Sequence, residues 1–402
     1  MTGVRVDEVL EQATSRAAAH FADPADLRGS DTWVHELLVD VESHQPEVPT
    51  IAERRDDSAP RPRPKSTVEL TIVIPAYNEE RRLVPGLERL QEATDTGAFD
   101  ADSTEIIVVN DGSTDRTEAV ARDLLRSYPH HRVLTLAANS GKGGAVRAGI
   151  AAATGRTTAF MDSDMGTDPT GVPTLLEALL TADIAIGSRS VPGSVVDRKY
   201  YRRKLMGSAW SKLVNSMTDV SISDTQCGFK AFRTPVARLL FHYAATAGFA
   251  FDVEVLMIAR HLGLEIAEVP VNWTSIDGSR VRPVDPPLMV IDVIRSRRGL
   301  RRLPALDAIL VSVTPGISDT EATGLVVEQA GPLLPVVREQ GDRHLVLLPL
   351  CGPAEIEDVR ARLAAIPGSR VCHLAVPVTT VSRHLSVSSD ASDSRATIDL
   401  FA

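Results

Sequence analysis

Short apolar runs alternate with segments of helical spacing between residues 67 and about 303. Apolar runs bounded by polar loops predict buried strands, whereas apolar positions three or four residues apart predict helices. The predicted strands cover residues 70–75, 105–109, 133–136, 158–161 and 184–187. The predicted helices between them lie near residues 80–93, 114–126, 143–153 and 172–181. This alternation predicts an α/β fold with a mostly parallel sheet and helices on both faces.

Three polar clusters follow directly after predicted strands, at residues 75–80, 110–115 and 162–164. The carboxyl ends of parallel strands lie at one edge of a sheet, and ligands of such sheets bind outside that edge. The shared placement of the three clusters therefore predicts a nucleotide site.

The third cluster, Asp162-Ser-Asp164, contains two carboxylates separated by one residue. If the strand continued through it, both side chains would point to the same face of the sheet. Two hard oxygen ligands suit Mg²⁺ or Mn²⁺ that holds a diphosphate. A solvated strand end is the alternative interpretation of this motif taken alone.

Two other loops offer ligand contacts and simpler alternatives. The Asp111 carboxylate could accept the imide N–H of a uracil ring. The simpler interpretation is a helix N-cap by Ser113 or Thr114, and both can hold at once because they use different residues. Lys142, in the glycine-rich run 139–147, could neutralise a phosphate, although a solvated lysine is the ordinary interpretation. The sequence leaves these alternatives open.

Composition excludes several classes of protein. A formal charge of −10 over 402 residues argues against a nucleic-acid binder, which normally carries a basic surface. Cys227, Cys351 and Cys372 form no C-x-x-C pair, which fits a reducing compartment and argues against a zinc site or a disulfide framework. We see no apolar signal region and no run near the roughly 20 apolar residues of a membrane span. These features predict a cytoplasmic protein.

The two ends of the chain differ from the central region. We expect a helical leader with a Pro/Arg-rich linker at residues 1–66. We expect a disordered tail at residues 381–402, which are rich in Ser and Asp. Residues 304–380 predict a small α/β unit with strands at 308–313, 345–350 and 371–376 and a helix at 355–365. No catalytic constellation is evident there, and His344 is expected at the surface or in a turn. The role of this unit is left open.

Seven motifs carry a family resemblance. Four of them occur in the order typical of inverting family 2 glycosyltransferases with a GT-A (Rossmann-like) fold: Pro75-Ala-Tyr-Asn-Glu79, Asn110-Asp-Gly-Ser-Thr-Asp115, Asp162-Ser-Asp164 and Gly187-Ser-Arg189. Three more resemble dolichyl-phosphate β-glucosyltransferases and bacterial polyprenyl-phosphate glycosyltransferases: Asp224-Thr-Gln-Cys-Gly-Phe-Lys230, Ala250-Phe-Asp-Val-Glu254 and Glu268-Val-Pro-Val-Asn-Trp-Thr274. The resemblance covers residues 67 to about 303.

This resemblance implies inverting transfer of glucose from UDP-glucose to a polyprenyl (dolichyl-type) phosphate, with Mg²⁺ or Mn²⁺ as the cofactor. The implied metal ligands are Asp164 and Asp162. The implied donor-binding residues are Pro75, Ala76, Tyr77, Glu79, Asp111, Asp162, Ser163 and Gln226. The implied catalytic residues, at the metal, the sugar and the acceptor phosphate, are Asp224, Asp164, Arg189 and Arg203.

A polyprenyl phosphate lies in a membrane, so we expect peripheral contact with the inner face of the membrane. Basic residues at 198–204 precede an apolar helical face, which is typical of an interfacial helix, and a second arginine cluster lies at 295–302. Two alternatives stay open: a transferase that uses GDP-mannose or a soluble acceptor, and a nucleotide-sugar-binding regulator without turnover. The oligomeric state is left open.

Overall fold

The computed structural model describes residues 68–197, 214–215, 218, 220–276, 285–300, 303, 306–313, 319–331, 333–338 and 343–376. The predicted leader at 1–66, the basic residues 198–204 with Arg203, and the predicted tail at 381–402 lie outside these residues. Among the described residues, no helix is both long enough and apolar enough to cross a membrane.

The larger sheet has seven strands in the order β3-β2-β1-β4-β7-β5-β8. Its strands are β1 (Leu70–Ala76), β2 (Thr104–Asn110), β3 (His130–Thr135), β4 (Thr157–Met161), β5 (Ile184–Ser188), β7 (Phe229–Arg233) and β8 (Ile266–Pro270). Strand β7 is antiparallel to β4 and β5, and the other neighbours are parallel. The prediction of a mostly parallel sheet is therefore confirmed.

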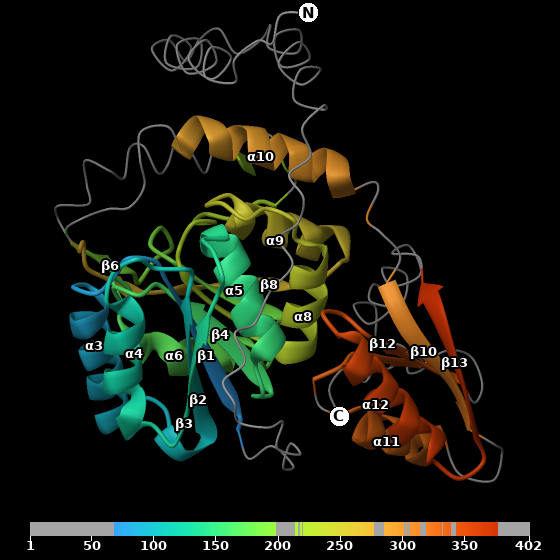
Figure 1. The fold of residues 1–402 in the computed structure, drawn as a ribbon. Coiled ribbons are helices and arrows are strands. Elements are labelled where there is room, and N and C mark those ends of the chain that lie inside the picture. Colours follow the sequence, from blue (N-terminus) through green and yellow to red (C-terminus); the bar gives the residue numbers. More distant parts are fainter. Residues whose placement is uncertain are drawn as a thin grey trace, which may run out of the picture.

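Helices cover both faces of this sheet (Figure 1). One face packs against α5 (Gly141–Ala152), α8 (Thr234–Tyr243) and α9 (Phe251–His261). The other packs against α3 (Leu83–Asp95), α4 (Thr117–Leu124) and α6 (Val172–Ala178). Short 3-10 helices lie at Ala101–Ser103 (η2), Leu125–Ser127 (η3) and Pro169–Gly171 (η4). The larger sheet is thus the middle layer of three.

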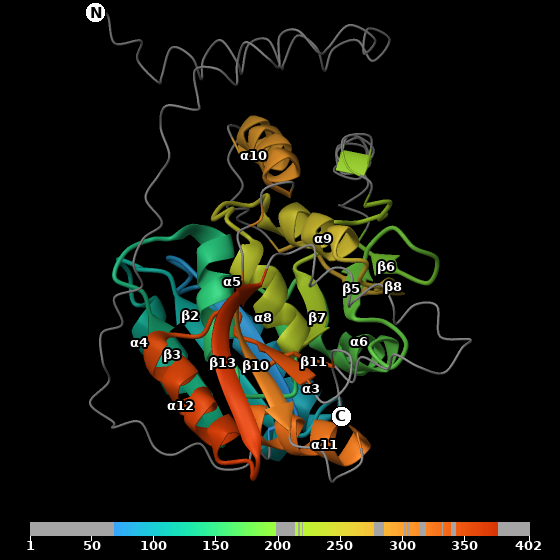
Figure 2. The same cartoon turned by 90° about the vertical axis from the view of Figure 1, so that its right-hand side faces the viewer.

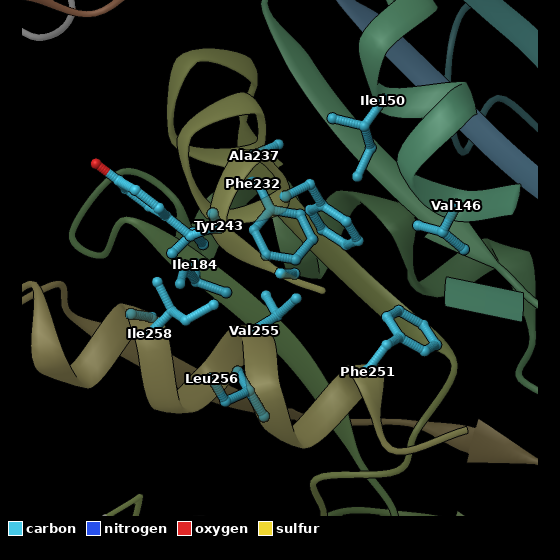
Figure 3. Packing of buried hydrophobic residues seen from close by; sticks show 14 of the residues in the cluster. Val146, Ile150, Ile184, Phe232, Ala237, Tyr243, Phe251, Val255, Leu256 and Ile258 are labelled. Atoms are coloured by element: carbon cyan, nitrogen blue, oxygen red, sulfur yellow. The ribbon is translucent and has the colours of Figure 1, made fainter. Parts of the chain in front are cut away.

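Alternation along the strands explains why both layers form. On β1, Val73 belongs to the cluster under α5, whereas Ile72 and Ile74 belong to the cluster under α3, and all three side chains are fully buried. Figure 3 shows part of the first cluster, in which Phe251 of α9 lies near Val146 of α5, and Phe232 of β7 lies above Val255 of α9. Each such aliphatic or aromatic side chain contributes about 1.5–3 kcal/mol on burial, so the core is what fixes the strand ends in place.

A short strand pair and one further helix complete the larger unit. Strands β6 (Val195–Val196) and β9 (Asn272–Trp273) form a short parallel pair. Helix α10 (Asp285–Gly299) packs on α9 and buries Met289 and Val293 in the same core cluster. Figures 1 and 2 both show α10 on the side of α9 away from the sheet.

The smaller sheet is antiparallel, in the order β11-β12-β10-β13. Its elements follow a β-α-β-β-α-β sequence: β10 (Leu306–Val313), α11 (Asp319–Ala330), β11 (Val336–Arg338), β12 (Arg343–Leu347), α12 (Pro353–Ala364) and β13 (Ser369–Val376). Helices α11 and α12 share one apolar core with the sheet. This is the split βαβ arrangement. The domain boundary at about residue 304 stays a prediction.

The two sheets are joined through α8. Leu306, Ala308 and Leu347 of the smaller sheet lie in the core cluster that contains α8. Arg238 of α8 is fully buried and forms an ion pair with Glu355 of α12, with a distance of 3.2 Å. The smaller unit therefore packs against the helical layer of the larger one.

Several local expectations differ from the structure. Strand β4 ends at Met161, so Asp162 and Asp164 lie on a loop and the idea of a shared strand face is wrong. Strand β7 was not predicted, because Lys230 interrupts its apolar run. His344 is buried, with 1% exposure, beside the Thr323 hydroxyl at 2.9 Å, so its expected surface position is wrong.

Candidate active site

The loop after β1 is joined by hydrogen bonds to the loop after β2. The Asn78 amide N–H donates to Ser113 Oγ at 2.9 Å, and Asn78 Oδ1 accepts the Thr114 amide N–H at 2.8 Å. The Glu79 amide N–H donates to Thr117 Oγ1 at 2.8 Å. Ser113 and Thr114 therefore bind the neighbouring loop and do not cap α4, which begins at Thr117 without a side-chain cap bond from its N-cap residue Arg116.

Asp111 lies at the end of β2 and is 2% exposed. Its Oδ1 accepts the amide N–H and the hydroxyl of Ser140, both at 2.7 Å, where α5 begins. Burial raises the pKa of Asp111, and the hydrogen bonds from Ser140 only partly oppose this rise. The turn thus has a structural role at the start of α5, and the predicted uracil contact stays a prediction.

The Asp162-Ser163-Asp164 loop is held closely on two sides. A Cβ atom on Gly86 of α3 would lie 2.1 Å from the Ser163 carbonyl oxygen, and one on Gly228 would lie 2.2 Å from Asp162 Oδ2. The Asp162 amide N–H donates to the Gly228 carbonyl at 3.1 Å. A larger residue at Gly86 would collide with the backbone of this loop, and one at Gly228 would displace the Asp162 carboxylate.

Each carboxylate of this loop has its own cation. Lys142 Nζ lies 2.8 Å from Asp162 Oδ1, and its side chain is 20% exposed, so Lys142 is not simply solvated. Burial alone would lower the pKa of Lys142, but Asp162, Asp252 and Asp164 together raise it above the ordinary lysine value. Asp164 pairs with Arg82, which precedes α3 and also contacts Glu79 at 3.3 Å.

These carboxylates fit the donor set of a metal that holds a diphosphate. Asp162 pairs with Lys142, and Asp164 pairs with Arg82. The charge of Asp164 also acts on Lys142, so the two carboxylates belong to one negatively charged region. Mg²⁺ commonly uses one or two carboxylates and completes its shell with phosphate and water. In the ranges that the structure describes, no group of three or more His, Cys, Asp or Glu side chains offers a complete protein cage.

Asp224, which precedes the start of β7, and Arg189, which follows the end of β5, form a bidentate ion pair. Arg189 Nε donates to Asp224 Oδ2 at 2.6 Å, and Nη2 donates to Oδ1 at 2.8 Å. Burial would raise the pKa of Asp224, but the hydrogen bonds and charge of Arg189 outweigh it and lower that pKa. Asp224 is therefore a firmly ionised carboxylate and a weak base. The Arg189 guanidinium also lies 5.6 Å from the centre of the Trp273 ring.

A buried ion pair lies under the site and links two of the sequence motifs. Lys230 Nζ contacts Asp252 Oδ1 and the Cys227 carbonyl, each at 2.6 Å, and Lys230 is 1% exposed. In the same segment, Glu254 accepts the Thr246 amide N–H at 2.7 Å and is also bound by a serine of α10 at 2.9 Å. These charges thus fix the turn at 224–228 and the loop before α9.

The predicted site residues otherwise fall as follows. Pro75 and Ala76 are buried at the end of β1, and Tyr77 is exposed beside them. Ser163 is 8% exposed, and the buried Gln226 Nε2 finds no hydrogen-bond partner in the described part of the chain. Arg203 lies outside the described residues. Arg82, Trp273 and the pairing of Lys230 with Asp252 were missed, although Lys230, Asp252 and Trp273 stand inside quoted motifs.

All these groups lie along one edge of the larger sheet. The pairing of Ala76 with Asn110, Val73 with Phe160 and Met161 with Phe229 places the ends of β1, β2 and β4 beside the start of β7. The end of β5 joins them, because β5 also pairs with β7. The prediction that the polar clusters meet at one edge therefore agrees with the register of the sheet.

A solved structure and two curated relatives resemble the chain. The glucosyl-3-phosphoglycerate synthase from Mycobacterium tuberculosis, in complex with Mg²⁺ and UDP, is 23% identical with a TM-score of 0.43, over 60% of this chain and 84% of that one. The dolichyl-phosphate beta-glucosyltransferase of Dictyostelium discoideum is 33% identical over 67% of this chain and 84% of its own length. The Drosophila melanogaster enzyme of the same name is 40% identical over 54% of this chain and 70% of its own length.

The family model for glycosyl transferase family 2 matches residues 71–241, from β1 to α8. This range contains Asp111, Asp164 and Arg189, which follow β2, β4 and β5, and Asp224, which precedes β7. The relatives above match most of their own length at 33% and 40% identity. The chain therefore belongs to glycosyl transferase family 2, among the dolichyl-phosphate beta-glucosyltransferases.

Proposed function

We propose that the chain transfers glucose from UDP-glucose to a polyprenyl (dolichyl-type) phosphate and inverts the configuration at the anomeric carbon. The observation that carries this proposal is the 33% identity to a dolichyl-phosphate beta-glucosyltransferase over 84% of that enzyme's length. The ion-paired carboxylates along one sheet edge agree with a site for a charged donor and a charged acceptor.

The donor side comprises the joined loops after β1 and β2 and the loop after β4. Pro75, Ala76, Tyr77 and Glu79 hold the nucleoside in this proposal, and Asp111 accepts the uracil imide N–H. The rigid connection between the two loops supports this assignment, because a preorganised site loses less entropy when it binds a ligand. Ser163 and Gln226 lie on the diphosphate and sugar side.

Asp164, with Asp162 beside it, would hold Mg²⁺ or Mn²⁺. A bound ion of this kind would supply Lewis-acid stabilisation of the charge that develops on the leaving diphosphate, worth several kcal/mol. Lys142 and Arg82 are the described cations nearest to these carboxylates and add positive charge on the same side.

The acceptor side is the pair of Asp224 and Arg189, together with Arg203. The lipid phosphate attacks the anomeric carbon from the face opposite the diphosphate, which produces a β-linked lipid phosphate sugar. A phosphomonoester with a second pKa near ~6 is mostly ionised at neutral pH, so a strong base is not required. The lowered pKa of Asp224 agrees with an orienting role and not with that of a general base.

We place this activity in residues 67–303 and assign no role to residues 304–380. We also propose peripheral contact with an anionic membrane surface. Residues 198–204 lie outside the described residues, but α10 presents the exposed Leu288, Arg297 and Arg298. Near an anionic surface, each such cation adds on the order of 1 kcal/mol.

Transfer assays with the purified full chain test the function. UDP-glucose, UDP-galactose and GDP-mannose would each be offered with and without a polyprenyl phosphate, in Mg²⁺ and in excess chelator. We expect glucose from UDP-glucose in a lipid-linked product, and only with metal. Faster transfer from GDP-mannose, equal transfer to a water-soluble phosphate, or full activity in chelator would contradict the proposal.

A further inference from the structure

Arg82 connects the donor loop to the loop that carries the two carboxylates. Its guanidinium contacts Glu79 Oε1 at 3.3 Å and pairs with Asp164 through Nη2. Its side chain is 19% exposed and that of Asp164 is 21% exposed, so the pair is partly open to a ligand. The other Asp164 oxygen, Oδ1, accepts the Gly166 amide N–H at 3.0 Å. Both oxygens of the predicted metal ligand are therefore engaged.

A cation on Asp164 changes how a divalent metal ion can bind there. A metal ion that arrives alone must compete with the guanidinium for the same carboxylate, and Lys142 opposes it further at Asp162. A diphosphate removes this obstacle, because it offers Arg82 charge-assisted, bidentate hydrogen bonds in exchange. The pair of Arg82 with Asp164 would then be replaced by two interactions, that of Arg82 with the diphosphate and that of the metal ion with Asp164.

We propose that Arg82 is a positioning residue that holds Asp164 until a nucleoside diphosphate and a divalent ion arrive together, so that metal binding depends on the nucleotide. This inference rests on the proposed function, since it uses Asp164 as the metal ligand. By linkage, the factor by which the nucleotide tightens the metal equals the factor by which the metal tightens the nucleotide.

A merely structural tether makes the opposite prediction. If Arg82 only kept Asp164 in place for the metal, its removal would leave a less ordered carboxylate and weaker metal binding. If Arg82 competes with the metal, its removal strengthens metal binding in the absence of nucleotide. A gain in affinity is also not a result that misfolding produces.

Mn²⁺ binding to the full chain provides the test, with free Mn²⁺ measured by electron paramagnetic resonance, without and with saturating UDP. In the unmodified chain, we expect UDP to raise the Mn²⁺ affinity by at least about fivefold. In Arg82→Gln, the affinity without UDP should rise by about fivefold or more, and the further gain from UDP should shrink accordingly. The matched control is Arg81→Gln, which removes the same charge from the adjacent, exposed arginine and should behave like the unmodified chain.

Unchanged or weaker Mn²⁺ binding in Arg82→Gln without UDP, or the same gain in Arg81→Gln, would overturn the inference while the proposed function stands. An unmodified chain that does not bind UDP with Mn²⁺ would overturn both. If Arg82→Gln unfolds at a much lower temperature, Arg82→Lys takes its place. That variant keeps one charge but loses the fork, so its Mn²⁺ affinity without UDP should lie between the other two, and a value at or below the unmodified chain overturns the inference.

Discussion

The two sheets of the molecule differ in what they bury. Both have aliphatic cores, but the larger sheet also buries Asp111, Asp224, Lys230 and Asp252 at or under one edge. Among the described residues of the smaller unit, the buried polar side chains are Thr323 and His344. A buried charge is costly unless it is paired, and these four lie beside the residues of the candidate site, whereas the buried Arg238 lies away from that edge and pairs with Glu355.

The same comparison shows how each region is held. In the larger unit, ion pairs cross between loops that are far apart in the sequence, as in Arg82 with Asp164 and Lys142 with Asp162. In the smaller unit, α12 has ion pairs within the helix, as in Arg362 with Asp358 at 3.2 Å, and its Glu355 pairs with Arg238 of the larger unit. Ion pairs in the larger unit therefore hold its loops in place, and the following experiments test this difference between the two units.

The largest expected effect is on catalysis at the metal ligand. Asp164→Ala removes the carboxylate predicted to hold the metal, so transfer should fall by about 10²–10³-fold or more. Steady-state transfer of labelled glucose measures this. Asp123→Ala is the matched control, because its carboxylate is 70% exposed and lies on α4. Near-normal transfer by Asp164→Ala would contradict the placement of the active site at this edge of the sheet.

The next effect is on stability. Lys230→Met leaves Asp252 buried without its cation and should lower the free energy of unfolding by about 3–5 kcal/mol. Thr323→Val, which removes a buried hydrogen bond to His344 in the smaller unit, should cost only about 1 kcal/mol. Chemical denaturation measures both, and the double variant Lys230→Met/Asp252→Leu should recover much of the loss. An equal loss in the free energy of unfolding at Lys230 and Thr323 would contradict the proposed difference between the two sheets.

A smaller effect is expected at the acceptor side. Arg189→Lys keeps the charge but loses the bidentate grip on Asp224, so the KM for the lipid phosphate should rise roughly tenfold with a smaller change in kcat. The KM for UDP-glucose in the same assay is the internal control and should change little. A rise confined to the KM for UDP-glucose would place Arg189 on the donor side.

The smallest effect is expected where the two units meet. Glu355→Gln removes one charge but keeps a hydrogen-bond acceptor for the buried Arg238 guanidinium, and since Glu355 is itself 30% exposed, the cost should be about 1 kcal/mol. Transfer should be unchanged, because this contact lies away from the strand ends. A loss of transfer without a loss of stability would show that the smaller unit acts on the site.

The sequence predicted the elements whose signal is local. The apolar runs that became β1, β2 and β4 stand out because each is continuous and ends in a polar loop. Strand β7 did not, because a buried lysine occupies its middle. Strand β3 begins three residues earlier than predicted, because its first residues, His130, His131 and Arg132, are polar and do not extend the apolar run.

The site was predictable in its place but not in its partners. Strand ends indicate which residues reach the edge of the sheet, and this is a local property. The cation that pairs with Asp164 lies 82 residues away at Arg82, and nothing in the spacing of either residue identifies the other. Likewise, the Ser113 and Thr114 side chains were equally compatible with a helix cap until the position of Asn78 was known.

A crystal structure of the full chain with UDP and Mn²⁺ tests the central claim most directly, namely that this edge of the larger sheet is the donor site. We predict the uracil against Asp111, Mn²⁺ on Asp164 with Asp162 beside it, and the Arg82 guanidinium on the diphosphate and no longer on Asp164. UDP bound away from the ends of β1, β2 and β4, or Mn²⁺ bound without either carboxylate, would contradict the account.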